Sequence, residues 1–330
     1  MINLKKVGLT ALAGSLVAFS ANAADLALSG GVELTYVDTG GTGANQITGN
    51  SFGANSNMAA TASGDVGFGT LSMTRGISQT GGLTSSFQSL DMGDAGILSF
   101  DSVAGAMVGL TANDDLLPTA YEEAWTGVSG SGISGVGSTN VIGYRNTIGG
   151  VSLSLGYTNG EGSTATAESA SSGLGAHGST TDMYVSMSPI DGFTIGAGRS
   201  VNTATNSASA GTTDTEETVG HIVYSSGPVS VGYRMAESDS GAAATAGTEM
   251  EGYSIAFNVN DNFAISYGQQ DSTKKAIGAT AAVTEEVDGI SAAYTVGAAS
   301  IRLNHSESSN DGKVAGVNDE TTEIGVVLSF

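Results

Sequence analysis

The sequence has no cysteine, only three prolines and one tryptophan, and few charged residues. Without cysteine, the chain has no disulfide framework, no cysteine-based zinc site and no thiol nucleophile. Lysine and arginine total 10 against 32 acidic residues, which excludes the clustered positive charge that nucleic-acid binding needs. Charged residues are 13% of the chain, whereas about 25% is usual for a soluble domain. We therefore expect something other than water to cover part of its surface.

Long hydrophobic runs are also missing beyond the first twenty residues, where nothing approaches the ~18 apolar residues of a membrane helix. This excludes a helical membrane protein. Residues 1–23 begin with two lysines, continue as an apolar run and end on Ala-Asn-Ala. That order is typical of a cleavable secretory signal, so we expect export and a mature chain of residues 24–330.

Most of the mature chain alternates apolar residues with small or polar ones, as in Val151–Thr158 and Tyr253–Val259. A period of two is the signal of strands with two differently solvated faces. Very short turns rich in Gly, Asp and Asn alternate with long polar segments, a rhythm typical of repeated hairpins. The alternation predicts strands near residues 25–37, 58–65, 69–78, 83–92, 97–102 and 140–147, and ten more from Val151 onward.

A total of sixteen antiparallel strands predicts an all-β transmembrane barrel, with short turns at one end and long loops at the other. A closed barrel pairs every backbone group without an exposed edge. The apolar positions of each strand then face lipid, and the alternate positions, which carry small and polar residues, face a water-filled lumen. A secreted β-sandwich or propeller is the alternative, but it leaves unexplained the aromatic residues that recur at strand ends, among them Tyr157, Tyr233, Tyr253, Tyr267, Phe193, Phe263 and Phe330.

With these features the chain resembles the trimeric general diffusion porins of Gram-negative outer membranes, over residues 24–330. The most specific part is the last strand, Ile324–Phe330, in which apolar residues alternate up to a terminal phenylalanine. The resemblance implies that Phe330 belongs to a signal read by the barrel assembly machinery. It also implies a homotrimer in outer-membrane lipid that passes small hydrophilic solutes without a cofactor and without enzymatic activity.

Residues 103–139 correspond in order to the third loop of porins, which the resemblance implies folds inward and narrows the channel. This segment holds Asp114, Asp115, Glu122 and Glu123, together with the only tryptophan, Trp125. The alternative is another solvated surface loop, as acidic segments usually are.

Strand parity predicts that Arg145, Arg234 and Arg302 line the lumen, with Glu33 and Asp101 on the same side. A charge facing lipid at mid-bilayer costs about 2–4 kcal/mol, which favours the same placement. The resemblance implies that the carboxylates of the loop face these three arginines across the channel. We expect the channel to have a mild preference for cations. The alternative role for the arginines is to hold the inserted loop in place.

Arg75 and Arg199 fall on the lipid-facing parity of their strands. Either a β-bulge turns them toward the lumen, or they lie at the outer rim with their charged ends in water. Their position is left open between these two.

No catalytic, cofactor or metal site is predicted. His177, His221 and His305 lie in different segments, and we find no ligand at metal-site spacing from any of them. The acidic segments 214–217 and 318–320 have oxygen ligands for Ca²⁺ or Mg²⁺ at the cell surface. A substrate-selective channel of the same architecture, a barrel adhesin and a barrel enzyme are the other functions considered.

Overall fold

The computed structural model describes residues 25–43, 46–103, 109, 113, 116–128, 140–159, 177–204, 214–240, 247–276 and 281–330. These ranges contain sixteen β-strands and two single-turn 3-10 helices, η1 (Gly93–Ala95) and η2 (Asp311–Lys313). No helix among the described residues is long and apolar enough to span a membrane. The strands are β1 (Asp25–Gly41), β2 (Phe52–Asp65), β3 (Thr70–Ser78), β4 (Leu83–Asp91), β5 (Ile97–Val103), β6 (Val141–Ile148), β7 (Val151–Asn159), β8 (His177–Ile190), β9 (Phe193–Ala204), β10 (Thr215–Ser226), β11 (Val229–Ser240), β12 (Thr248–Asn260), β13 (Phe263–Lys274), β14 (Val283–Val296), β15 (Ala299–Ser309) and β16 (Asn318–Ser329).

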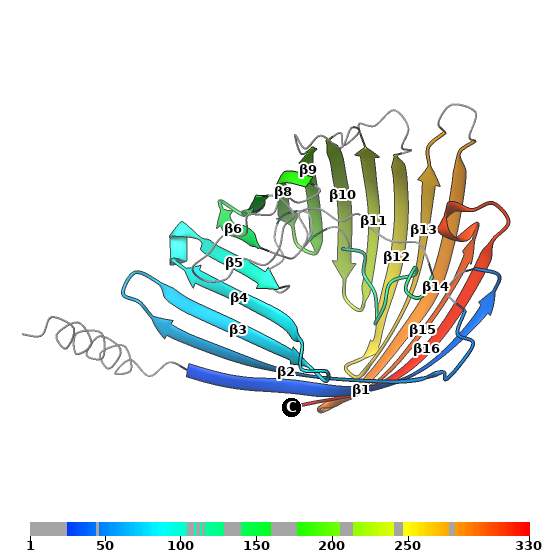
Figure 1. Ribbon diagram of the computed structural model, residues 1–330, viewed down its shortest axis with the longest axis horizontal. Helices are drawn as coiled ribbons and strands as arrows, with labels where there is room; N and C mark the ends of the chain where they lie inside the picture. The colour runs from blue at the N-terminus through cyan, green and yellow to red at the C-terminus, as the bar shows by residue number, and fades with distance from the viewer. Residues whose placement is uncertain are drawn as a thin grey trace, which may run out of the picture.

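The strands form one closed antiparallel barrel, in which each strand pairs with its neighbours in sequence (Figure 1). The barrel closes where β1 pairs with β16, with Tyr36 opposite Ile324 and Gly31 opposite Ser329. The predicted fold class and strand number are thus confirmed. Residues 1–24, which include the predicted secretory signal, lie outside the described residues.

The second strand begins at Phe52, six residues before its predicted start near residue 58. Its first half is rich in Gly, Ala, Asn and Ser, so neither face shows a clear apolar pattern. The structure pairs this half with β1, and the rings of Tyr36 and Phe52 meet edge to face with centroids 5.3 Å apart. Register with a neighbouring strand, rather than its own alternation, defines the start of β2.

The two faces of the barrel have opposite character. Large apolar side chains point outward and are exposed, such as Leu34 and Ile301, at 57% and 55%. The inward-facing positions carry Ser, Gly, Thr and charged residues, many of them buried. The barrel wall therefore has an apolar outside and a polar inside, as the alternation predicts.

Candidate functional site

The main feature of the lumen is a chain segment packed against the inside of the barrel. Residues 116–128, which belong to the loop between β5 and β6, lie within the ring of strands (Figure 1). The Ser254 hydroxyl donates to the carbonyl of Pro118 at 2.7 Å. Two further serines of adjacent strands, Ser266 and Ser291, accept the backbone N–H groups of Ala120 and Tyr121 at 2.9 and 3.1 Å. This segment is called the inner loop, and the inner faces of β11–β16 that it contacts are called the covered wall.

Glycines in the covered wall make room for the inner loop. A Cβ atom on Gly289 lies 2.9 Å from both Cα and the carbonyl oxygen of Ala124, and one on Gly268 lies 3.3 Å from Cβ of Ala124. Gly268 and Gly289 are direct cross-strand partners, and Ser254 pairs with Gly268 from the other side. A row of small residues therefore crosses three strands at one level and lets the loop backbone approach the sheet closely.

Apolar contacts hold the beginning of the inner loop. Val219, Ala236 and Met250 are buried on the inner faces of β10, β11 and β12, and Leu116 packs against them. Leu117 is itself 9% exposed. Burial of these side chains stabilises the inserted position of the loop.

Two predicted lumen arginines contact aromatic residues of the inner loop. The Arg234 guanidinium lies 5.2 Å from the ring centroid of Trp125, and Arg302 lies 5.0 Å from that of Tyr121. Both arginines are on the inner face, but Arg234 is only 1% exposed, so it is buried beneath the loop and does not line water. Arg302 remains partly exposed, with Nη1 4.0 Å from Oε1 of Glu33. Cation–π contacts of this kind help to anchor the loop.

Carboxylates gather around Tyr121. Its hydroxyl donates to Glu323 at 2.9 Å, and the Thr126 hydroxyl donates to Glu122 at 3.1 Å and to Glu123 at 3.4 Å. Burial and the neighbouring Glu123 raise the pKa of the Glu122 carboxyl. Burial, followed by the hydrogen bond to Glu323, raises the pKa of Tyr121, which therefore stays protonated. The loop and the wall together form an acidic cluster with Arg302 beside it.

A different part of the inner surface is open. Arg145 on β6, Thr147, Ser152 on β7 and Ser186 on β8 line a cavity of about 790 Å³ near the short turns. These four residues are called the open wall. Asn113 of the loop between β5 and β6 also lines this cavity. A second open space of about 400 Å³ is bounded by Glu33 and Arg302 at the seam of β1 and β16.

The remaining predicted pore residues have other positions. Asp101 is on the inner face but 1% exposed, so it is buried. Asp114 and Asp115 lie outside the described residues. Arg199 points outward and makes a two-pronged ion pair with Glu216, at 2.6 and 2.7 Å, instead of entering the lumen.

Arg75 also keeps the outward parity, next to Gln88 of β4. The bulge between β3 and β4 comes after Arg75, at Gly76 and Ile77, so it does not turn this arginine toward the lumen. Arg75 and Arg199, whose positions the sequence left open, therefore both lie on the outer face of the barrel.

Sequence reasoning missed the residues that hold the inner loop. Ser254, Ser266, Ser291 and Glu323 all occupy inward positions of the C-terminal strands. A signal for them exists in the sequence, because small residues recur at inward positions of β11–β14. That these residues lie at the same height in neighbouring strands becomes visible only once the strand register is known.

The barrel is similar to solved porin structures. A porin matches with a TM-score of 0.67 and 17% identity, over 93% of this chain and 100% of that chain. An anion-selective porin from Comamonas acidovorans matches with a TM-score of 0.66 and 14% identity, over 93% and 100% of the two chains. The trimer form of OmpT, an outer membrane protein of Vibrio cholerae, matches with a TM-score of 0.63 and 12% identity, also over 93% and 100%.

No protein-family model matches the sequence, and no curated protein matches it either. The likeness is one of fold, carried by backbone geometry over almost the whole length. The chain therefore has the sixteen-stranded porin fold.

Proposed function

We propose that this protein is a passive channel for small hydrophilic solutes and ions across the bacterial outer membrane. One observation carries the proposal: the inner loop is packed on the covered wall, while the open wall borders a cavity of about 790 Å³ that none of the described residues fills. A lumen filled by a plug, as in a closed adhesin, has no such space. A passive channel needs no catalytic residue and no cofactor, and we assign none.

The location and assembly form part of the same proposal. The apolar outer face matches a lipid environment, and the secretory signal expected in residues 1–23 supplies the export route. A homotrimer is proposed because the structurally similar OmpT has a trimer form. Phe330 is proposed as the end of the signal for the barrel assembly machinery. Residues 24–330 are then one barrel domain, with residues 103–139 as its constriction loop.

We further propose mild cation preference. Glu33, Glu122 and Glu323 surround Tyr121, Glu123 adjoins Glu122, and Arg302 is the nearby positive charge. Selectivity follows the local ring of charge rather than the fold, so the anion-selective porin among the structural matches does not determine the sign here. Arg145 on the open wall opposes this preference and keeps it mild.

Planar-bilayer recordings of the purified mature protein under a KCl gradient test the proposal. We expect steady open-channel current in groups of three steps, with a reversal potential on the cation side. A bilayer that stays closed would contradict the channel. Reversal on the anion side would contradict only the proposed preference and would make Arg145 and Arg302 the dominant charges.

A further inference from the structure

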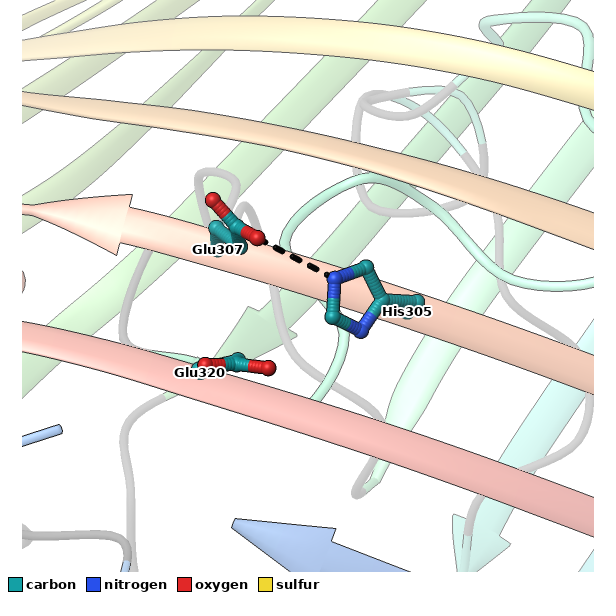
Figure 2. Close-up of side chains that lie close together, drawn as sticks. All are labelled: His305, Glu307 and Glu320. Carbon is teal, nitrogen blue, oxygen red and sulfur yellow. Dashed lines mark hydrogen bonds and ion pairs between the residues drawn. The ribbon is translucent and has the colours of Figure 1, made fainter. Parts of the chain in front are cut away.

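A cluster of three ligand-bearing side chains lies on the outside of the barrel, away from the lumen. His305 and Glu307 are on β15 and Glu320 is on β16 (Figure 2). Their inward-facing neighbours Asn304, Ser306 and Thr321 are buried, which places the three side chains on the opposite, outer face.

Strand geometry brings these residues together. His305 and Glu307 are two positions apart, so they share one face of β15. Glu307 is the direct cross-strand partner of Glu320, and His305 is the partner of Thr322. One ligand atom from each of His305, Glu307 and Glu320 lies within 4.8 Å of the other two.

The imidazole of His305 is held in an orientation suited to a ligand. Nδ1 lies 2.8 Å from the Thr322 hydroxyl, and Nε2 faces Oε1 of Glu307 at 3.2 Å. Metal-binding histidines commonly have one ring nitrogen fixed by a hydrogen bond while the other binds the ion. Thr322 fills this role for Nδ1, which leaves Nε2 for a cation between the two carboxylates.

The local charge also calls for a cation. Glu307 has a carboxylate partner on each side, because it pairs with Asp288 of β14 as well as with Glu320. Like charges directly opposite each other in a sheet are destabilising. None of the arginine or lysine ion pairs among the described residues includes Asp288, Glu307 or Glu320.

We propose that His305, Glu307 and Glu320 form a binding site for a divalent transition-metal ion of the zinc type. One imidazole nitrogen and two carboxylate oxygens are ligands that Zn²⁺ accepts, whereas Ca²⁺ and Mg²⁺ prefer oxygen alone. Three protein ligands leave a fourth position for water. The ion joins β15 to β16, beside the seam where β16 meets β1, and neutralises the facing carboxylates.

This proposal is independent of the channel. The three residues face outward, and none of them belongs to the acidic cluster around Tyr121 or to the open wall. Loss of metal binding is therefore expected to leave the conductance unchanged, so failure of one proposal does not decide the other.

Equilibrium dialysis of the purified mature protein in detergent, after chelation, tests the site with Zn²⁺ as the probe. We expect one histidine-dependent Zn²⁺ per chain, not displaced by an equal concentration of Ca²⁺ or Mg²⁺. His305→Gln and Glu307→Gln remove this Zn²⁺. Thr322→Val keeps all three ligands but frees the imidazole, so we expect its affinity to fall about tenfold.

Glu286→Gln is the matched control, because Glu286 is an outward-facing carboxylate on β14 that pairs with Ser309 and lies outside the cluster. It is expected to bind Zn²⁺ as the unchanged protein does, and circular dichroism checks that every variant is folded. The proposal is overturned if His305→Gln retains the same Zn²⁺, if Glu286→Gln loses it, or if Ca²⁺ displaces it at equal concentration.

Discussion

The covered wall and the open wall are built from the same kind of strand, yet they meet the lumen differently. Both place small polar residues inward, such as Ser291 on the covered wall and Ser152 on the open wall. Ser291 is 4% exposed beneath the inner loop, whereas Ser152 borders the open cavity. Strand parity assigns a residue to the lumen, but the inner loop determines whether solutes reach it.

The same contrast separates two arginines. Arg234 on the covered wall is buried and stacks on Trp125, while Arg145 on the open wall is exposed. We therefore assign Arg234 to loop anchoring and Arg145 to contact with permeating ions. Substitutions on the two walls are expected to affect different properties, stability on one and selectivity on the other.

Arg234→Ala is expected to have the largest effect. It removes a desolvated cation–π contact worth about 2 kcal/mol and leaves a gap beneath the loop. The variant is expected to unfold at a lower temperature and to show larger, noisier single-channel currents, measured by thermal denaturation and bilayer recording. Arg145→Ala is the matched control: it should keep the melting temperature and move the reversal potential further to the cation side. Equal melting temperatures for both variants would contradict the distinction between the walls.

Gly289→Val is expected to displace the inner loop at a single point. Its new side chain overlaps the backbone of Ala124, and overpacking of this kind costs about 1–3 kcal/mol. Thermal denaturation and protease cleavage of the loop measure the effect. Gly220→Val introduces the same side chain where a Cβ finds only one atom, at 4.0 Å, and should leave both measurements unchanged. Equal protease sensitivity in the two variants would show that the glycine row does not seat the loop.

Glu122 is expected to give the selectivity a pH dependence. Because its pKa is raised, Glu122 takes up a proton at higher pH than an ordinary glutamate as the solution is acidified. The cation preference should therefore begin to fall at higher pH in the unchanged protein than in Glu122→Gln, as measured by reversal potentials. The raised pKa also links Glu122 to stability, because the protonated carboxyl stabilises the docked loop. This contribution is complete at pH values below the pKa of Glu122 in the unfolded state, and it is lost as the pH rises through the raised pKa of the folded state. Identical pH profiles would remove Glu122 from the selectivity account.

Arg199→Ala is expected to have the smallest effect. Its ion pair with Glu216 is on the outer face but at the loop end of the barrel, because Glu216 is the second residue of β10, and exposed ion pairs of this kind contribute little. Conductance, reversal potential and melting temperature should all stay close to those of the unchanged protein. A clear shift of reversal potential would place Arg199 in the conduction path and contradict the observed outward position.

The barrel itself could be predicted because its signals are local. Alternation along Val151–Asn159, or along the last strand, depends only on neighbouring residues. The covered wall could not be predicted in the same way, since the row from Ser254 through Gly268 to Gly289 exists only once three strands are in register. Burial of Arg234 depends on Trp125, more than 100 positions away in the sequence.

The cluster of His305, Glu307 and Glu320 has a signal in the sequence that the prediction did not use. The prediction that no histidine has a metal ligand at suitable spacing overlooked the two-residue separation of His305 and Glu307, which puts both on one face of a strand. Glu320 belongs to an acidic segment that was considered for Ca²⁺ or Mg²⁺. Its contact with the histidine depends on the β15–β16 register and therefore needed the structure.

Cysteine accessibility tests the central claim most directly, because the chain has no cysteine of its own. Ser152→Cys and Ser291→Cys each place one thiol on the inner face, on the open wall and on the covered wall respectively. A charged thiol reagent added during bilayer recording is expected to reduce the current of Ser152→Cys at once and to leave that of Ser291→Cys unchanged. Rapid block of Ser291→Cys, or no response from Ser152→Cys, would contradict the claim that solutes pass along the open wall while the inner loop covers the other.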